Sequence, residues 1–258
     1  MRKASVVASI ILLLMVLGGT LAYNHMKKEN VLTPSGTENK YVRGHNIPGK
    51  LYWAGSAYDK EVALTFDDGP ETQWTPQILD ILKAKNVKAT FFVIGRQAEK
   101  YPEMLRRMVA EGHSIGNHTF DHADLTKMSP QEAEYEIDRC IQAVSRNTGK
   151  KPRLVRPPFG FHNTEVDNMI YAKNGLVILW SLDTQDWMGM SEEKIKTQVL
   201  SSMKNGFIVL QHDGENPKLG GSVQALPAII DGLKAQGYAF VTIDELLETQ
   251  PYYETEQQ

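Results

Sequence analysis

Val62-Ala63-Leu64-Thr65-Phe66-Asp67-Asp68-Gly69 places two adjacent carboxylates at the end of an apolar run. The apolar run is typical of a buried strand, and the pair Gly69-Pro70 ends it. Adjacent carboxylates repel each other and lose water at a strand end, so a fold that places them there usually supplies a partner. A metal ion is such a partner, since one Asp can ligate it while the other handles a proton. The alternative is a solvated turn, because Asp-Gly is also common in turns.

From Lys60 onward, short apolar runs alternate with helical patterns. The runs expected to be strands are 62–66, 89–94, 114–117, 154–156, 176–182, 207–211 and 240–243. Helical patterns lie near 74–85, 99–111, 130–147, 163–174, 191–204 and 223–236. Strands that alternate with helices at this spacing indicate parallel βαβ units. The sequence therefore predicts a barrel-like α/β fold with about seven parallel strands.

The bulk composition is that of an ordinary globular protein. The chain has 258 residues, of which 41% are hydrophobic and 23% are charged, and its net charge is −3. This charge balance gives no sign of a basic surface, so we expect no nucleic-acid partner. Nothing in the sequence implies a protein partner. The single cysteine, Cys140, excludes an intramolecular disulfide. It lies in a helical pattern, where we expect a small buried side chain rather than a nucleophile.

The N-terminal segment indicates export across a membrane. Arg2 and Lys3 precede an uncharged apolar stretch over residues 4–23. A short basic region before an apolar core is typical of a secretory signal or an uncleaved anchor, and the sequence leaves both open. An uncleaved segment would make the membrane a partner. The expected organisation is a signal or anchor helix at 1–27, a linker at 28–58, a folded domain at 59–248 and a polar tail at 249–258.

Two histidines, His118 and His122, follow the third apolar run four residues apart. This spacing puts both on one face of a helix, and in a loop both can close on one ion. With Asp68 they would form a set of two histidines and one carboxylate that leaves coordination positions of the metal open for water and substrate. Such a set is typical of a hydrolytic zinc site. The alternative is two unrelated surface histidines. Chemistry gathers at the carboxyl ends of parallel strands, which favours the metal site, and we expect His113 to be a packed core histidine.

Arg156-Pro157-Pro158-Phe159-Gly160 follows the fourth run. Arg156 is suited to pair with a carboxylate, and Asp67 is the candidate. The two prolines lack an N–H, so the amide of Phe159 is the next free donor and could point at a developing oxyanion. The alternative is a Pro-rich loop with a surface arginine.

The last two predicted strand ends carry further polar residues. Asp183-Thr184-Gln185-Asp186-Trp187 follows the fifth run, and Leu210-Gln211-His212 ends the sixth. Trp187 is either core packing or a wall for a sugar ring. His212 is a candidate general acid, because a neighbouring acid such as Asp186 would raise its pKa and keep it protonated.

These five segments, in this order, resemble the motifs of the polysaccharide deacetylase family, which is carbohydrate esterase family 4 with its NodB-homology domain. The resemblance spans roughly residues 60–248. It implies a distorted (β/α) barrel and a divalent metal, usually zinc. It also implies hydrolysis of the N-acetyl group of N-acetylglucosamine-type sugars, which gives a free amine and acetate.

The resemblance assigns the central roles. Carried over residue by residue, it implies that Asp68, His118 and His122 hold the metal. It implies that Asp67 is the general base for the attacking water and that His212 is the general acid for the leaving amine.

The resemblance also assigns supporting roles. It implies that Arg156 orients Asp67 and that Asp186 tunes His212. The amide of Phe159 would stabilise the oxyanion, while Trp187 and Leu210 would line the pocket for the acetyl methyl. Phe159 stands where the family usually has Tyr, so the backbone role survives and any hydroxyl contact to the sugar does not.

We expect an acetylated glycan outside the cytoplasm as the substrate, with the enzyme anchored to the membrane or secreted into a bacterial cell envelope. Peptidoglycan is favoured, and chitin oligomers are the alternative. Zinc is the expected metal, although such a ligand set also accepts cobalt, nickel or iron. Two other classes stay open, namely a non-catalytic sugar-binding module of the same fold and a metal-dependent hydrolase of another bond.

Overall fold

The computed structural model describes residues 46–254. The signal or anchor segment expected at 1–27, and most of the expected linker, lie outside the described residues. Between residues 46 and 254 no helix is both long enough and apolar enough to cross a bilayer.

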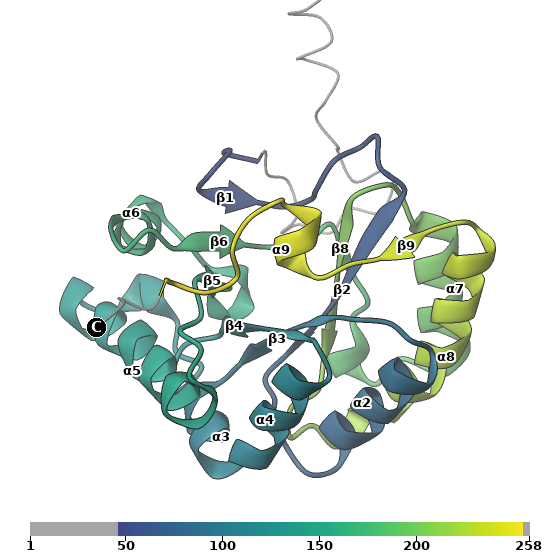
Figure 1. The fold of residues 1–258 in the computed structure, drawn as a ribbon, viewed down its shortest axis with the longest axis horizontal. Coiled ribbons are helices and arrows are strands. Elements are labelled where there is room, and N and C mark those ends of the chain that lie inside the picture. Colours follow the sequence, from purple (N-terminus) through teal and green to yellow (C-terminus); the bar gives the residue numbers. More distant parts are fainter. Residues whose placement is uncertain (1–45, 255–258) are drawn as a thin grey trace, which may run out of the picture. The chain divides into compact units, whose positions relative to one another are not determined.

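A single sheet with only parallel pairings forms the centre of the fold (Figure 1). Its strand order is β1-β6-β5-β4-β3-β2-β8-β7, and β9 pairs with β2. In the described part of the chain, no pairing joins the edge strands β1 and β7. The curled sheet is therefore an open half-barrel. The strands are β1 Leu51–Tyr52, β2 Glu61–Asp67, β3 Thr90–Val93, β4 Ser114–Asn117, β5 Leu154–Val155, β6 Leu176–Ile178, β7 Leu182–Asp183, β8 Phe207–His212 and β9 Ala239–Phe240.

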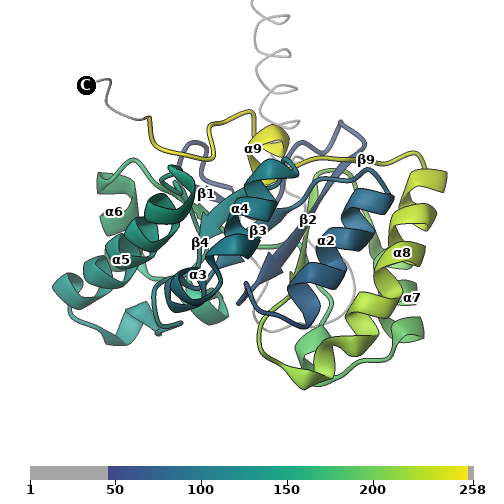
Figure 2. The same cartoon turned by 60° about the horizontal axis from the view of Figure 1, so that its bottom comes forward.

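Helices cover the outer face of this sheet (Figure 1), and Figure 2 shows α2, α3, α4 and α8 in front of it. The helices are α2 Trp74–Ala84, α3 Gly95–Lys100, α4 Pro102–Ala110, α5 Pro130–Thr148, α6 Thr164–Ala172, α7 Glu192–Ser202, α8 Gly220–Ala235 and α9 Ile243–Leu246. Short 3-10 turns are η1 Leu125–Lys127, η2 Pro158–Gly160, η3 Asp186–Met188 and η4 Pro217–Leu219.

The sequence of α5 contains its own start and stop signals. The Ser129 side chain accepts a hydrogen bond from the amide of Glu132, and the Glu132 carboxylate accepts one from the amide of Ser129. Pro130 begins the helix, where a missing N–H costs nothing. Gly149 ends it with a φ of 72°, a left-handed conformation that glycine adopts without strain. These signals fix the residues at which the helix begins and ends.

Strand β2 divides its side chains between the two faces of the sheet. Val62, Leu64 and Phe66 belong to the apolar core shared with the outer helices. Successive side chains of a strand point to opposite faces, so Thr65 and Asp67 face the inside of the half-barrel. The strand that supplies the acidic pair is thus anchored on its outer face and presents Asp67 on its inner face.

The predicted α/β architecture is confirmed, with differences in the strands. The run 176–182 is two strands, β6 and β7, and the chain between them crosses from one edge of the sheet to the other. The amide of Leu179 donates to Tyr52 O in β1, while the amide of Ser181 donates to Ile208 O in β8. A buried apolar run does not reveal such a crossing, because every residue in it stays apolar.

The ends of the folded part also differ from the expectation. Strand β1 lies within the expected linker and pairs with β6, and Leu51 is buried. At the other end, Arg153 donates to Pro251 O and Tyr253 donates to Lys151 O, so part of the expected tail packs on the chain before β5. The run 240–243 gives only the two-residue strand β9, because Thr242 caps α9.

Candidate active site

The carboxyl ends of the strands surround a cavity of about 380 Å³. Eight of the ten predicted site residues line it, namely Asp67, Asp68, His118, His122, Phe159, Trp187, Leu210 and His212. The other two, Arg156 and Asp186, have no exposed surface and bond to residues that line the cavity.

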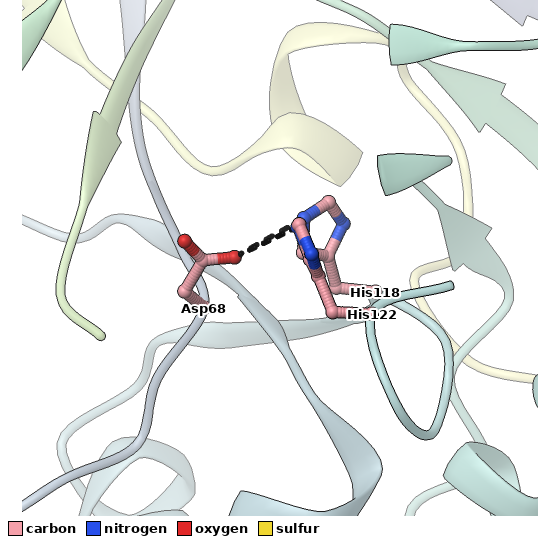
Figure 3. A group of neighbouring side chains, drawn as sticks. All are labelled: Asp68, His118 and His122. Carbon is pink, nitrogen blue, oxygen red and sulfur yellow. Dashed lines mark ion pairs between the residues drawn. The ribbon is translucent and has the colours of Figure 1, made fainter. Parts of the chain in front are cut away.

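Asp68, His118 and His122 form a compact triad (Figure 3), and one ligand atom from each lies within 4.8 Å of the others. The distance from Asp68 Oδ1 to His118 Nε2 is 3.4 Å, and that to His122 Nε2 is 3.3 Å. Asp68 Oδ1 is buried and has no hydrogen-bond partner. His118 Nδ1 lies 2.7 Å from Arg156 O, which can only accept, so Nδ1 carries a proton. In the neutral ring Nε2 is therefore the nitrogen with a lone pair for a metal.

The backbone at two triad residues and at Thr119 between the histidines adopts conformations that non-glycine residues rarely take. The φ angles are 78° for Asp68, 64° for Thr119 and 61° for His122. Residues held in the left-handed region store strain and cluster at functional sites. The two histidines lie in a loop after β4 and not on a helix. The loop turns so that both imidazoles approach Asp68.

Glu136 of α5 holds this histidine loop, and the sequence analysis missed it. Its carboxylate accepts hydrogen bonds from the amides of Phe120 at 3.0 Å and Asp121 at 2.8 Å. Glu136 is itself buried. A charged residue at a buried position of an amphipathic helix was the signal that could have identified it.

Asp67 is fixed by Arg156 through a hydrogen bond of 2.7 Å from Nη1 to Oδ1. The guanidinium also donates to Thr65 Oγ1, Ile178 O and Leu179 O at 2.8 to 3.2 Å. Both partners are almost fully buried. Because three further hydrogen bonds fix the arginine, the Asp67 carboxylate has one orientation and one neutralising charge.

Asp186 makes two hydrogen bonds to His212. Its Oδ1 lies 2.7 Å from His212 Nδ1, and its Oδ2 accepts from the His212 amide at 2.9 Å. Burial alone would lower the pKa of His212, but the charge and hydrogen bond of Asp186, with smaller contributions from Asp68 and Asp67, raise it to about 10. His212 is thus an imidazolium near neutral pH, and its Nε2–H is the proton that remains available.

The ligand atoms of the triad carry the charges that a cation needs. Burial is the largest influence on Asp68 and would raise its pKa, yet the imidazoles of His118, His212 and His122 together hold that pKa well below its usual value. Burial, followed by the charge of His118, lowers the pKa of His122. The triad therefore favours one ionised carboxylate beside a neutral imidazole.

Four further residues line the cavity without having been assigned a role from the sequence. They are Pro157, Phe161, Trp180 and Asp183. Trp180 lies where the chain crosses between β6 and β7, and the unpredicted crossing explains why it was missed, whereas Asp183 ends β7. Burial raises the pKa of the Asp183 carboxyl.

Comparison with known proteins gives the same family as the motifs. The model of the polysaccharide deacetylase family matches residues 54–178. A peptidoglycan-N-acetylglucosamine deacetylase of Bacillus cereus is 42% identical over 199 residues, which are 77% of this chain and 72% of that protein. A chitooligosaccharide deacetylase of Bradyrhizobium sp. is 38% identical over 199 residues, which are 72% of this chain and 90% of that protein.

The solved structures show the same fold. The crystal structure of the Bc1960 peptidoglycan N-acetylglucosamine deacetylase matches with a TM-score of 0.78 and 40% identity, over 79% of this chain and 95% of that one. The resemblance drawn from the five segments is confirmed. The chain belongs to the polysaccharide deacetylase family and is a polysaccharide N-deacetylase.

Proposed function

We propose that this deacetylase is metal-dependent and removes the N-acetyl group from N-acetylglucosamine-type residues of a glycan outside the cytoplasm. The observation that supports it most is the buried Asp68 Oδ1, which has no hydrogen-bond partner and faces two imidazole nitrogens. A buried carboxylate oxygen without a donor costs free energy unless a cation occupies the space in front of it.

The triad fits a divalent metal by composition and by spacing. Metal–ligand bonds of about 2.0–2.1 Å at tetrahedral angles place ligand atoms about 3.3 Å apart. The separations of 3.4 Å and 3.3 Å from Asp68 Oδ1 to the two Nε2 atoms agree with this value. Two imidazoles and one carboxylate are a donor set for zinc first, with cobalt, nickel or iron as alternatives.

A bound metal would act as a Lewis acid and lower the pKa of water in the cavity. Asp67 accepts the proton of the attacking water, and the hydrogen bond from Arg156 orients this carboxylate. As the water oxygen bonds to the acetyl carbon and the carbon–nitrogen bond breaks, His212 Nε2–H protonates the leaving nitrogen. The products are acetate and a free amine.

The remaining predicted residues would recognise the acetyl group. Leu210 is buried and lines the cavity with Trp187, which gives an apolar surface for the methyl. Phe159 lies at the cavity wall, and we propose that its amide donates to the developing oxyanion.

Peptidoglycan is the favoured substrate, and a chitooligosaccharide is the second candidate. The B. cereus relative is named for the first and the Bradyrhizobium relative for the second. The basic and apolar N-terminal sequence supports an extracytoplasmic enzyme, either anchored or secreted, to which peptidoglycan is accessible.

Acetate release tests this proposal directly. The purified protein is incubated with peptidoglycan and with a chitooligosaccharide, with and without a chelator, and acetate is measured. We expect release that a chelator abolishes and added zinc restores. Asp68→Ala should release no acetate and hold no metal by elemental analysis. Activity that persists after complete metal removal would contradict the metal proposal, and acetate from neither glycan would contradict the substrate class.

A further inference from the structure

The two ends of the parallel sheet differ in charge. The segments that lead into strands at their amino ends are residues 46–50, 54–60, 85–89, 111–113, 149–153, 173–175, 203–206 and 236–238. They contain nine basic residues and two acidic ones, Asp59 and Glu111. The segments that leave the carboxyl ends are 68–73, 118–129, 156–163, 184–191 and 213–219, and they contain three basic and seven acidic residues. The catalytic cavity therefore opens at an acidic end of the sheet, and the opposite end is basic.

The basic residues concentrate before three neighbouring strands. Strand β1 pairs with β6, and β6 pairs with β5 (Figure 1). Adjacent strands lie about 5 Å apart, so the residues just before these three share a region about 10 Å wide along the sheet. We call this region the basic edge, and it comprises Lys50, Lys150, Lys151, Arg153 and Lys173. The segments 46–50, 149–153 and 173–175, which supply these residues, contain no Asp or Glu.

Aromatic rings lie against two of the exposed lysines of the basic edge. Lys50 Nζ is 5.2 Å from the centroid of the Tyr171 ring, and Lys150 Nζ is 5.4 Å from that of Tyr252. A ring attracts an ammonium group without carrying a negative charge. These lysines therefore keep their positive charge, and each has an amphipathic tyrosine beside it.

The other members of the basic edge are held by the fold to different degrees. Arg153 donates to Asn174 O, which is uncharged, and Lys173 pairs with the carboxylates of Glu134 and Asp138. Lys151 is exposed.

The C-terminal segment adds some negative charge beside this region. Residues 248–254 pack here, since Tyr253 donates to Lys151 O, and they contribute Glu248 and Glu254. The basic edge still has more positive than negative charges, and Lys50, Lys150 and Lys151 are the exposed positive ones.

An exposed apolar residue and the entry of the chain lie at the same place. Ile47 is 48% exposed, in the turn in which the amide of Leu51 donates to Ile47 O. Residues 1–45 join the fold through Asn46, so the apolar N-terminal sequence is attached beside the basic edge. Lysines with tyrosines and an exposed aliphatic side chain are typical of protein surfaces that lie at the headgroups of a bilayer.

We propose that the basic edge lies on the headgroups of a membrane that contains anionic lipid. The lysines bind the negative surface, and Ile47 and the tyrosines enter the region between headgroups and acyl chains. The same surface repels the acidic end of the sheet, so the catalytic cavity faces away from the membrane. The contact needs neither metal nor glycan, and it can therefore fail while the proposed function holds.

Amine labelling of the full-length protein on vesicles tests this contact. The protein is reconstituted with phosphatidylcholine alone and with equal parts of phosphatidylcholine and phosphatidylglycerol, and acetylation of each lysine is followed by mass spectrometry. We expect Lys50, Lys150 and Lys151 to react about fivefold or more slowly on the anionic vesicles. Lys127 and Lys218, which are exposed at the acidic end, should react equally on both. High salt should remove the difference, because it screens the charges.

A pair of double variants identifies the charges that matter. Lys150→Glu with Lys151→Glu reverses two charges of the basic edge, and the slow labelling of Lys50 should then be lost. Lys127→Glu with Lys218→Glu is the matched control, because it reverses two charges at the acidic end, and Lys50 should stay slow. None of these four lysines lines the catalytic cavity, so both variants should keep the unfolding midpoint and the acetate release from a soluble chitooligosaccharide.

Three outcomes separate the possible results. Equal labelling of Lys50 on the two kinds of vesicle would overturn the membrane contact. If soluble polyphosphate slows the same lysines as strongly as the anionic vesicles do, the basic edge is a site for polyanions and the membrane proposal is wrong. Slow labelling of Lys50 on anionic vesicles, without acetate release from any glycan, would support the contact and contradict the proposed function.

Discussion

At the scale of single residues, Asp67 and Asp68 are neighbours in sequence with different surroundings. Asp67 is 2% exposed and bonds to Arg156, whereas Asp68 leaves one oxygen facing two imidazoles. The sequence alone placed two like charges at a strand end. The structure separates them into a carboxylate neutralised by an arginine and a carboxylate open to a cation.

This separation predicts different effects for the two substitutions. Asp67→Asn removes the proton acceptor but leaves the triad intact, so we expect the rate to fall on the order of 10²-fold or more. The zinc content of the variant, measured by elemental analysis, should equal that of the wild type. Full activity in Asp67→Asn would show that another group is the base.

The pair of Asp186 and His212 predicts a change in pH dependence. The general acid works when protonated, so activity should be lost as the pH rises through the pKa of His212. Asp186 raises that pKa, and Asp186→Asn should therefore move the basic limb of the pH–rate profile to lower pH by about one unit or more. The profile of kcat from pH 6 to 11 measures it, because the wild-type limb is expected near the His212 pKa of about 10. An unchanged basic limb would show that His212 is not the group that titrates.

At the scale of secondary-structure elements, the long helix α5 positions the metal ligands through Glu136. Glu136→Ala leaves the amides of Phe120 and Asp121 without their acceptor inside the protein. We expect a stability loss of about 1–3 kcal/mol and zinc affinity lower by about 10- to 100-fold.

Urea unfolding and competition for zinc with a coloured chelator measure these two effects. Glu134→Ala is the matched control on the same helix, because Glu134 is half-exposed and pairs with Lys173 at the surface. Its substitution should change stability by less than about 0.5 kcal/mol. Equal zinc affinity in Glu136→Ala and Glu134→Ala would show that the loop keeps its shape without α5.

A buried histidine just before β4, His113, predicts a pH-dependent stability. His113 Nδ1 accepts a hydrogen bond from the amide of Ala89, so the folded state needs the neutral ring. Burial, followed by the charge of Lys88, lowers the pKa of His113 from 6.5 to about 4. Unfolded chains take up the proton first, so stability should fall as the pH decreases from 6.5 to about 4.

His113→Asn tests this effect, since Asn keeps an acceptor near the amide of Ala89 and does not titrate. Urea unfolding at pH 7 and pH 5 should show a loss for the wild type on the order of 1–2 kcal/mol larger than for the variant. Parallel pH dependence in both proteins would assign the titration to other groups.

At the scale of the whole molecule, the sequence predicted the site better than the sheet. All ten predicted residues lie in the cavity or directly behind it, because polar residues after apolar runs reveal strand ends. Strand β1 was missed because two residues give no periodic pattern. The crossing between β6 and β7 was missed because a buried run stays apolar whatever its direction. Glu136 was missed because its partners are backbone amides, which a sequence does not identify; its place on the buried face of α5 was the signal that remained.

The segment that includes Pro251 and Tyr253 packs on residues 151–153, just before β5 begins. It therefore lies at the amino ends of the strands, while the catalytic cavity opens at their carboxyl ends. A tether attached beyond residue 253 would start from the face opposite the catalytic one. An enzyme immobilised on a resin through that end would keep its catalytic cavity facing outward. Such an enzyme could act on insoluble cell-wall fragments that are too large to diffuse.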